Sequence, residues 1–526
     1  MFQFRLPQIF SNFPSVGGSG TAIRIPKADV HDVEERPEKR ARALKHLLKH
    51  NHITHSVIYN HLRFHNHVPH ILASSYIFGA DSDQLGDIYE AEGKHLEPWH
   101  DSPSEIAEHD WRDFLGKREY QRAFVDFFED RLVNLGYDWQ ALLDEYLLQG
   151  KEPLINNLIS GLGHPLIHLG YAQELSSRTV AIESLALAAC FYNDWHVYLD
   201  DPKYTKPART HPTPSSPSST VEPGSDNIQK LLSNSETANK TLEYWNSWDL
   251  KDPKTQFAES QKLAVALLVA SHPSQPPHSN SNPTSNSTHD FFLVHLLTTS
   301  HAVRVLLPLL PTKHHIPLVR QWWLFTLLVY IAQLRPRINI DTIKLVELEG
   351  RDWNWIQRQA LQGPFRTDAH FVKALRSMQE AGRLWGDVNQ FFLKAAVKFA
   401  EEFGGWGGFG VADGELAESE GMGSGRNTTP APLYCGPPIG FAAYLVQHTD
   451  PLTQKQTTST FGTVKAPRPV LRVACQAEKC MVCRPGMGGQ RFGEEGRGGG
   501  RGGEEGWGET VEGRDGGGGK KGLGMG

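Results

Sequence analysis

Apolar side chains recur at helical spacing through most of the chain. Phe124, Phe127, Phe128 and Leu132 lie one to four positions apart, so they fall on one side of an α-helix. Sustained alternation of apolar and polar residues, which marks a half-buried strand, is scarce. The pattern therefore predicts an all-α fold. We expect helices at about 36–51, within 59–80, at 118–148, in two pieces within 154–200, and at 227–246, 291–310, 318–334, 341–360 and 368–402.

Segments rich in Pro, Ser or Gly divide the chain. Residues 202–225 and 271–289 are dense in Pro and Ser, which is typical of flexible surface insertions. Residues 404–526 are rich in glycine, and such a segment cannot bury a core. We therefore predict an irregular N-terminal arm at 1–36, one large helical domain at 37–403 that contains both insertions, and a disordered low-complexity tail.

Charge and cysteine content narrow the class of protein. A net charge of -6 gives no reason to expect nucleic acid as a partner. The most apolar stretch, 318–334, is short and carries Arg320, so we expect no membrane span. The first residues lack the order of a secretion signal. Cys190 is the single cysteine of the predicted helical domain, which suits a reducing compartment. We therefore expect a cytoplasmic protein.

Histidine on apolar helices is the most informative pattern. Four separated segments show it: HNHVPHIL, GLGHPLIHLGYAQE, DFFLVHLLTTSH and TDAHFVKALRSM. A buried imidazole needs partners for both ring nitrogens. Several imidazoles that converge inside a helical bundle are most simply satisfied by a metal ion, and neutral nitrogen ligands suit iron, copper, nickel or zinc. The candidate ligands on these segments are His67, His70, His164, His168, His295 and His370.

Lys373 follows His370 by three positions, so the two share a helix face. Burial lowers the pKa of a lysine toward the neutral amine, which can react with carbon dioxide to give a carbamate, an anionic oxygen ligand. The alternatives are a lysine that reaches solvent and histidines that bond to backbone carbonyls or carboxylates within the core. The residues leave both interpretations open. We expect surface or packing positions for His52, His55, His61, His314 and His315.

Motifs for nucleotide cofactors are poor. GLGHPL, at Gly161, lacks the third glycine of a dinucleotide fingerprint, and GGWGGFG, at Gly404, has no helix after it. There is no P-loop, no G-x-S-x-G elbow and no H-E-x-x-H helix. A flavin domain is therefore not expected.

The four segments also occur in the order seen in a known family. FHNHVPHILASSYIFGADSDQLGDIYE, GLGHPLIHLGYAQE, DFFLVHLLTTSHAVRVLLPLL and DAHFVKALR resemble the questin oxidase-like family over about residues 40–400. The resemblance implies a helical enzyme of fungal secondary metabolism without a flavin fold. It also implies oxidative opening of a ring in an aromatic polyketide such as an anthraquinone, of Baeyer–Villiger type or by C–C cleavage.

The resemblance further implies a cofactor and a ligand set. Some family members hold non-haem iron through histidines and a carboxylated lysine, so the candidates become His67 or His70, His164 or His168, His295, His370 and Lys373. His295, His370 and Lys373 are the expected catalytic residues, with dioxygen and the polyketide as partners. NADPH is a possible reductant, although the chain shows no obvious site for it. His301 is not expected to be a ligand.

Aromatic residues near these segments are candidates for stacking on a planar substrate. They are Tyr76, Tyr171, Tyr192 and Trp195, with His196, Asp194 and Glu174 as groups that could orient the ligands. Two rivals remain: a non-catalytic helical protein that binds a polyketide, and a metal-dependent hydrolase. The sequence leaves open the exact substrate, the choice within each histidine pair, the need for NADPH and the oligomeric state.

Overall fold

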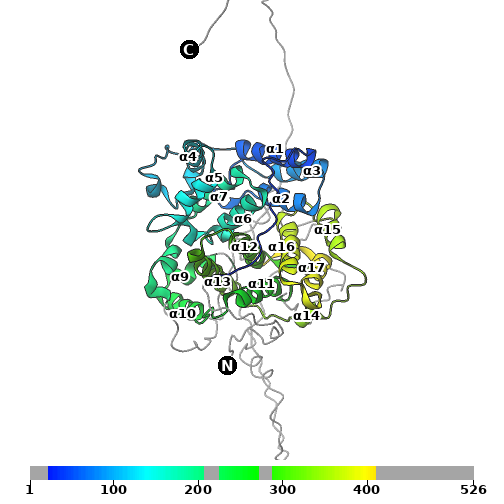
Figure 1. Cartoon of the computed structure of the whole chain (residues 1–526). Coiled ribbons are helices and arrows are strands. Elements are labelled where there is room, and N and C mark those ends of the chain that lie inside the picture. The colour runs from blue at the N-terminus through cyan, green and yellow to red at the C-terminus, as the bar shows by residue number, and fades with distance from the viewer. Residues whose placement is uncertain (1–21, 206–223, 225, 272–286, 410–526) are drawn as a thin grey trace, which may run out of the picture. The chain divides into compact units, whose positions relative to one another are not determined.

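The computed structural model describes residues 22–205, 224, 226–271 and 287–409, all within one compact unit. Helices dominate them (Figure 1), so the predicted all-α class is confirmed. The helices are α1 (Lys39–Thr54), α2 (Val68–Phe78), α3 (Ser82–Gly93), α4 (Gln121–Asn134), α5 (Trp139–Leu143), α6 (His164–Leu175), α7 (Arg178–Cys190), α8 (Val197–Asp200), α9 (Asp226–Ser233), α10 (Ser235–Asn246), α11 (Pro253–Val269), α12 (Phe291–Leu306), α13 (His315–Ala332), α14 (Asp341–Lys344), α15 (Trp353–Gln362), α16 (Ala369–Trp385) and α17 (Phe391–Glu402).

Four short strands form two small sheets among the described residues. Strand β1 (Ile58–Tyr59) pairs antiparallel with β2 (Phe64–His65). Strand β3 (Ser287–Asp290) pairs parallel with β4 (Phe403–Gly407), with an irregular register near the start of β3. The second sheet therefore joins the entrance of α12 to the end of α17.

Several predicted helices are interrupted where the backbone turns left-handed. The predicted helix 118–148 ends at Asn134 and resumes at Trp139, because Gly136 and Tyr137 have φ values of 64° and 67°. The carboxylate of Asp138 then accepts hydrogen bonds from the first free backbone N–H groups of α5, which restarts the helix. Apolar spacing continues across the break, so periodicity alone could not locate it.

Helices α2, α6, α12 and α16 form the centre of the fold. Helix α12 packs against α6 and α16, and α2 packs against the same two helices. Helices α7, α11, α13 and α17 pack around this group (Figure 1). Every residue of α12 is buried. Any polar side chain on its surface must therefore find its partners inside the protein.

Carboxylate caps fix where the two histidine-bearing helices α12 and α16 begin. Asp290 Oδ1 accepts from the backbone N–H groups of Phe292 and Leu293 at 2.8 and 3.0 Å. Asp368 Oδ1 accepts in the same way at the start of α16. Each cap satisfies donors that a helix leaves free in its first turn. The caps set the register in which the following side chains point inward.

The described part of the predicted N-terminal arm is extended and packs on the helical body. The N–H groups of His31 and Val33 donate to the carbonyl oxygens of Glu174 and Leu175 at 2.7 and 2.9 Å. Val33 is buried. The arm thus covers the end of α6.

The C-terminal limit of the body lies later than the predicted boundary at residue 404. Phe403 and Trp406 of β4 are buried, and Trp406 Nε1 donates to Asp368 Oδ2 at 2.8 Å. Residues 404–409 therefore belong to the helical body. The predicted tail after residue 409 and most of both predicted insertions lie outside the described residues.

The apolar segment 318–334 falls almost entirely within α13, which is a buried helix. The guanidinium of Arg320 lies 4.0 Å from the centre of the Trp245 ring and donates to Asn246 Oδ1 at 2.7 Å. None of the helices in the described ranges is long and apolar enough to cross a bilayer.

Candidate metal centre

His67 reaches the interior because it ends a short connection rather than continuing a helix. It occupies the N-cap position of α2, and Pro69 follows in the first turn. The side chain of Asn66 holds this connection: its Oδ1 accepts from the N–H of Val68 at 3.0 Å, and its Nδ2 donates to Asn51 Oδ1 at 2.9 Å. The imidazole of His67 is therefore presented on the inner side of α2.

His164 owes its position to a turn that only glycine fits. Gly163, directly before α6, has a φ of +75°, and a Cβ there would lie 2.3 Å from Thr299 Cγ2. His164 Nδ1 donates to the carbonyl oxygen of Gly161 at 2.7 Å. A carbonyl only accepts, so Nδ1 carries the proton and Nε2 keeps its lone pair. That Nε2 lies 2.8 Å from His67 Nε2.

His295, on α12, is held by a backbone carbonyl in the same way as His164. Its Nδ1 donates to the carbonyl oxygen of Phe291 at 2.8 Å, so the lone pair again stays on Nε2. His295 is fully buried, and Nε2 has no hydrogen-bond partner among the described residues. His370 Nε2, on α16, is also buried without a partner there. A buried orphaned nitrogen is costly unless something else bonds to it.

These four imidazoles form one group, called here the histidine cluster (His67, His164, His295 and His370). Ligand atoms of His67, His164 and His370 all lie within 4.8 Å of one another. The His295 ring centre is 5.0 Å from those of His164 and His370. Burial, followed by the charge of Lys373, lowers the pKa of His295 to about 3 and that of His370 well below its usual value. The cluster therefore offers neutral imidazoles, the form that binds metals.

Lys373 lies one turn after His370 and is fully buried. Its Nζ is 3.5 Å from His70 Nδ1. Burial lowers the pKa of Lys373 to about 7, and Asp368 and Glu92 offset only part of that effect. The alternative of a lysine that reaches solvent is therefore wrong. A substantial fraction of this amine is uncharged at neutral pH.

His70 and His168 are not part of the histidine cluster and bond to each other instead. His70 Nε2 and His168 Nδ1 are 2.7 Å apart. His65, which was not among the candidate ligands, stacks on His164 with ring centres 3.7 Å apart and planes at 3°. Its Nε2 is buried without a partner in the described part of the chain. Sequence reasoning missed this ring because no fixed spacing links β2 to the start of α6.

His52, for which a surface or packing position was expected, is buried and pairs with two carboxylates. Its Nε2 contacts Glu129 at 3.1 Å, and its Nδ1 contacts Glu183 at 2.9 Å. Burial opposes a charge on His52, but the hydrogen bonds to both carboxylates outweigh it and raise the pKa of His52 to about 9. The imidazole is therefore protonated at neutral pH.

This shift predicts a pH-dependent contribution of His52 to stability. Its pKa is 6.5 when unfolded and about 9 when folded, so the contribution is complete below pH 6.5 and is lost as pH rises through 9. The contribution is at most about 3 kcal/mol, reduced by the exposure of Glu129. The contribution of Lys373 to stability changes with pH in the opposite direction, because its pKa in the folded protein lies below the ordinary value of 10.5.

The test is therefore a difference between two proteins. At about pH 6 the free energy of urea unfolding of the parent protein should exceed that of His52→Gln. This difference should shrink by about pH 10. His46→Gln, at an exposed histidine of the same helix, should show no such trend. A gap that is constant across this range contradicts the assignment.

The predicted substrate residues do not gather at one place. Tyr171 lies next to His70, with ring centres 5.3 Å apart, and its hydroxyl bonds to Ser74 at 2.7 Å. Tyr76 instead lies under Arg40 at 4.0 Å. Tyr192 stacks on His196 at 4.8 Å. Trp195 is a partly buried residue that packs against the core. Of these, Tyr171 is the one that contacts a histidine next to the cluster.

The proposed orienting residues also separate. His196 Nδ1 bonds to Asp200 at 2.6 Å, and none of the contacts within the described part of the chain places Asp194 beside the histidine cluster. Glu174 forms a buried ion pair with Arg376 and contacts His301 Nε2 at 3.3 Å. His301 is thus occupied by this ion pair, in keeping with its exclusion from the ligands.

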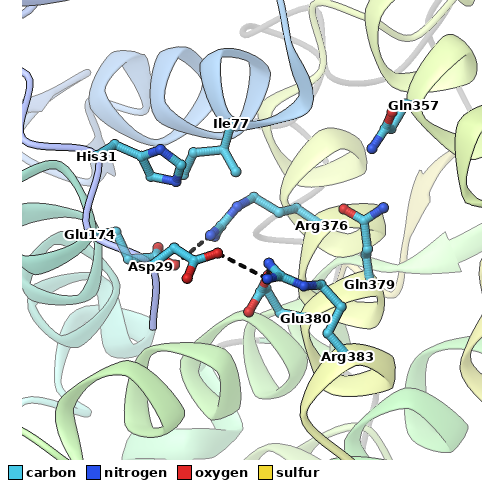
Figure 2. Close-up of a pocket in the computed structure, with 9 residues that line it drawn as sticks. All are labelled: Asp29, His31, Ile77, Glu174, Gln357, Arg376, Gln379, Glu380 and Arg383. Carbon is cyan, nitrogen blue, oxygen red and sulfur yellow. Dashed lines mark hydrogen bonds and ion pairs between the residues drawn. The ribbon is translucent and has the colours of Figure 1, made fainter. Parts of the chain in front are cut away.

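A polar cavity of about 310 Å³ lies beside this ion pair (Figure 2). Arg376 and Glu174 form its inner wall, and Arg383 pairs with Asp29 at 2.9 Å nearer to solvent. Arg376 is one turn from Lys373 on α16, and its guanidinium lies 5.6 Å from the Tyr171 ring. The cavity is therefore lined by a side chain that lies six positions after His370 on α16.

Comparison with known proteins gives several relatives. A Baeyer–Villiger oxidase from Pestalotiopsis microspora is 23% identical over 51% of this chain and 64% of its own length. One from Paecilomyces divaricatus is 31% identical over 27% of this chain and 28% of its own length. A questin oxidase from Aspergillus terreus is 26% identical over 31% of this chain and 38% of its own length. The matched segments thus span less than two thirds of each relative.

A family-wide comparison extends further along the chain. The sequence model of the questin oxidase-like family matches residues 64–378. That range covers more than half of the chain and includes the whole histidine cluster, His65, His70, His168 and Lys373. The chain belongs to the questin oxidase-like family.

Proposed function

We propose that this protein is an oxidoreductase that uses dioxygen and a histidine-bound iron ion to open a ring of an aromatic polyketide. The names of its relatives, Baeyer–Villiger oxidase and questin oxidase, support the reaction class. The observation that carries the metal is the convergence of imidazole nitrogens: two neutral Nε2 atoms at 2.8 Å and two buried Nε2 atoms without partners.

The residues present fit a transition metal. Two Nε2 lone pairs, those of His164 and His295, are set by backbone carbonyls. A donor set of neutral nitrogens suits iron, copper or zinc rather than magnesium or calcium. His67, His164, His295 and His370 would hold the ion. When bound, ferrous iron would activate dioxygen by electron transfer. Insertion of one oxygen atom would also need two electrons from a reductant such as NADPH, with the other oxygen atom leaving as water, whereas a C–C cleavage that keeps both oxygen atoms in the product would need none.

Lys373 is the natural source of the anionic ligand that the histidines lack. We propose that its neutral amine adds to carbon dioxide: an N–C bond forms at Nζ, the amine loses a proton and a carbamate results. The pKa near 7 supports this step because it leaves free amine available at neutral pH. His70 Nδ1 lies beside Nζ and can accept the hydrogen that remains on it.

Aromatic side chains around the histidine cluster would exclude water from it and would stack on a planar substrate. Phe291 contacts both His295 and His370, with ring centres 5.0 and 4.7 Å apart. Trp406 lies 5.8 Å from His370. On the other side, Tyr171 is held by Ser74 and offers an aromatic face near His70. Such walls favour a flat aromatic molecule over a polar one.

Metal analysis and oxygen uptake test the proposal. The chain purified without oxygen should hold about one iron per molecule. It should consume oxygen with a panel of anthraquinones, assayed both with and without NADPH. Chelator-treated protein should bind the anthraquinone but consume no oxygen until iron is restored. Turnover without oxygen would instead indicate a hydrolase, and binding without any turnover would indicate a carrier. Either result would overturn the oxidase proposal.

A further inference from the structure

His65 lies face to face with His164 of the histidine cluster, although it was not among the candidate ligands. The two imidazole rings have centres 3.7 Å apart, and their planes differ by 3°. His65 belongs to β2, whereas His164 is the first residue of α6, so the tertiary fold creates the contact. His65 is therefore placed to act on the cluster through His164.

The ring of His164 has one edge fixed by a hydrogen bond. Its Nδ1 donates to the carbonyl oxygen of Gly161 at 2.7 Å. A single bond of this kind lets the ring tilt, because the χ2 torsion of histidine is broad. A tilt would carry His164 Nε2 away from His67 Nε2, which lies 2.8 Å from it. A flat ring against the face of His164 opposes this motion, and His65 supplies that ring.

Strand pairing and two long side chains hold His65 in place. His65 pairs with Ile58 across β1 and β2. The buried side-chain amide of Gln121 accepts from the N–H of Ile58 at 2.8 Å and donates to its carbonyl oxygen at 2.9 Å. Arg118 donates to the carbonyl oxygen of Leu62, in the turn between the two strands, at 3.1 Å. The strand that carries His65 is thus tied to the helical body.

The packing around His65 leaves its ring little room to move. The ring centre of Phe191 is 4.6 Å from that of His65, and the guanidinium of Arg118 lies 4.5 Å from the centre of the Phe191 ring. A Cβ at Gly161, where φ is +55°, would lie 2.8 Å from Phe191 Cγ and 3.0 Å from His65 Nε2. Glycine therefore lets the backbone approach both rings, and its carbonyl oxygen is the one that holds His164.

We propose that His65 is a positioning residue, because the face of its ring holds the His164 ring in the plane that directs Nε2 into the histidine cluster. His65 Nε2 is buried without a hydrogen-bond partner among the described residues, so the role belongs to the ring face and not to that nitrogen. Groups that orient a ligand in this way alter metal affinity. The metal-binding consequence rests on the proposed function, whereas the plane of His164 does not.

The test compares His65→Leu, which has no flat face, with His65→Phe, which keeps a ring but loses both nitrogens. In crystal structures of the metal-free proteins, His164 should keep its plane and its 2.8 Å contact with His67 in the parent and in His65→Phe, but not in His65→Leu. Iron affinity, measured anaerobically against a competing chelator, should fall about 10- to 100-fold in His65→Leu. In His65→Phe it should return to within about threefold of the parent.

Phe64→Leu is the matched control, because Phe64 precedes His65 on β2 and its side chain points to the opposite face of the strand. Its ring lies 6.1 Å from that of Tyr59. This variant should match the parent in both measurements. If the larger ring of His65→Phe prevents folding, His65→Asn, with a smaller planar amide, takes its place. His65→Met replaces His65→Leu in the same way.

The proposal is overturned if folded His65→Leu keeps the plane of His164 and an iron affinity within about twofold of the parent. It is also overturned if His65→Leu and His65→Phe lose affinity equally, because the role would then belong to a nitrogen of His65. A parent protein that binds no iron would remove the proposed function. The crystal structures would still decide whether His65 orients His164.

Discussion

Replacing His370 by alanine should abolish iron binding and oxygen-dependent turnover while leaving the helices intact. His370 Nε2 is buried without a hydrogen-bond partner among the described residues, so its removal leaves no hydrogen-bonding group there without its partner. Its loss removes one neutral nitrogen from a set of four. Because metal affinity depends on the number of correctly placed ligands, we expect it to fall by more than about 100-fold.

His295→Ala should behave in the same way, since His295 Nε2 is equally unpartnered there. Iron per chain, circular dichroism and oxygen uptake would be measured on both variants. His109→Ala provides a control, because the side chain of His109 is 85% exposed. A folded His370→Ala protein with normal iron content and turnover would contradict the proposed centre.

The Glu174→Gln variant should lose about 3–5 kcal/mol of unfolding free energy. Glu174 and Arg376 are both 2% exposed and form an ion pair. Burial alone would raise the pKa of Glu174, but Arg376 and His301 lower it to about 2. The amide would leave the guanidinium buried without its ion-pair partner, and its Nε already lacks a hydrogen-bond partner in the described residues.

The same cavity offers a matched control. Asp29 and Arg383 form an ion pair whose side chains are 66% and 57% exposed. Asp29→Asn should therefore cost less than about 1 kcal/mol. Urea unfolding monitored by circular dichroism gives both values. A Glu174→Gln cost no larger than that of Asp29→Asn would show that the buried pair contributes no more than the exposed one.

Apolar spacing predicted the helices well but not their breaks. The break before α5 depends on left-handed backbone at Gly136 and Tyr137, which a periodic pattern does not reveal. Gly386, with a φ of 73°, likewise divides the predicted helix 368–402 into α16 and α17. Glycine marked both places, yet glycine also occurs at many positions where the chain does not turn.

The candidate site could be assembled from sequence only as a list of histidines. Spacing shows which side chains share a helix face, but the choice of His67 over His70 depends on α2 beginning at Val68. The ion pair of Glu183 with His52 was not predicted, although a signal existed: Glu183 is a carboxylate within the apolar run of α7. A buried charge of this kind requires a partner, and that partner, His52, lies 131 residues away.

Strand β4 also determines how the chain can be shortened. Trp406 covers the start of α16, because its Nε1 donates to Oδ2 of the capping Asp368 and its ring lies near His370. A protein truncated after residue 403 would keep every histidine of the cluster but would leave this carboxylate oxygen bare and admit water to His370. A minimal catalytic fragment should therefore retain the sequence through Phe409.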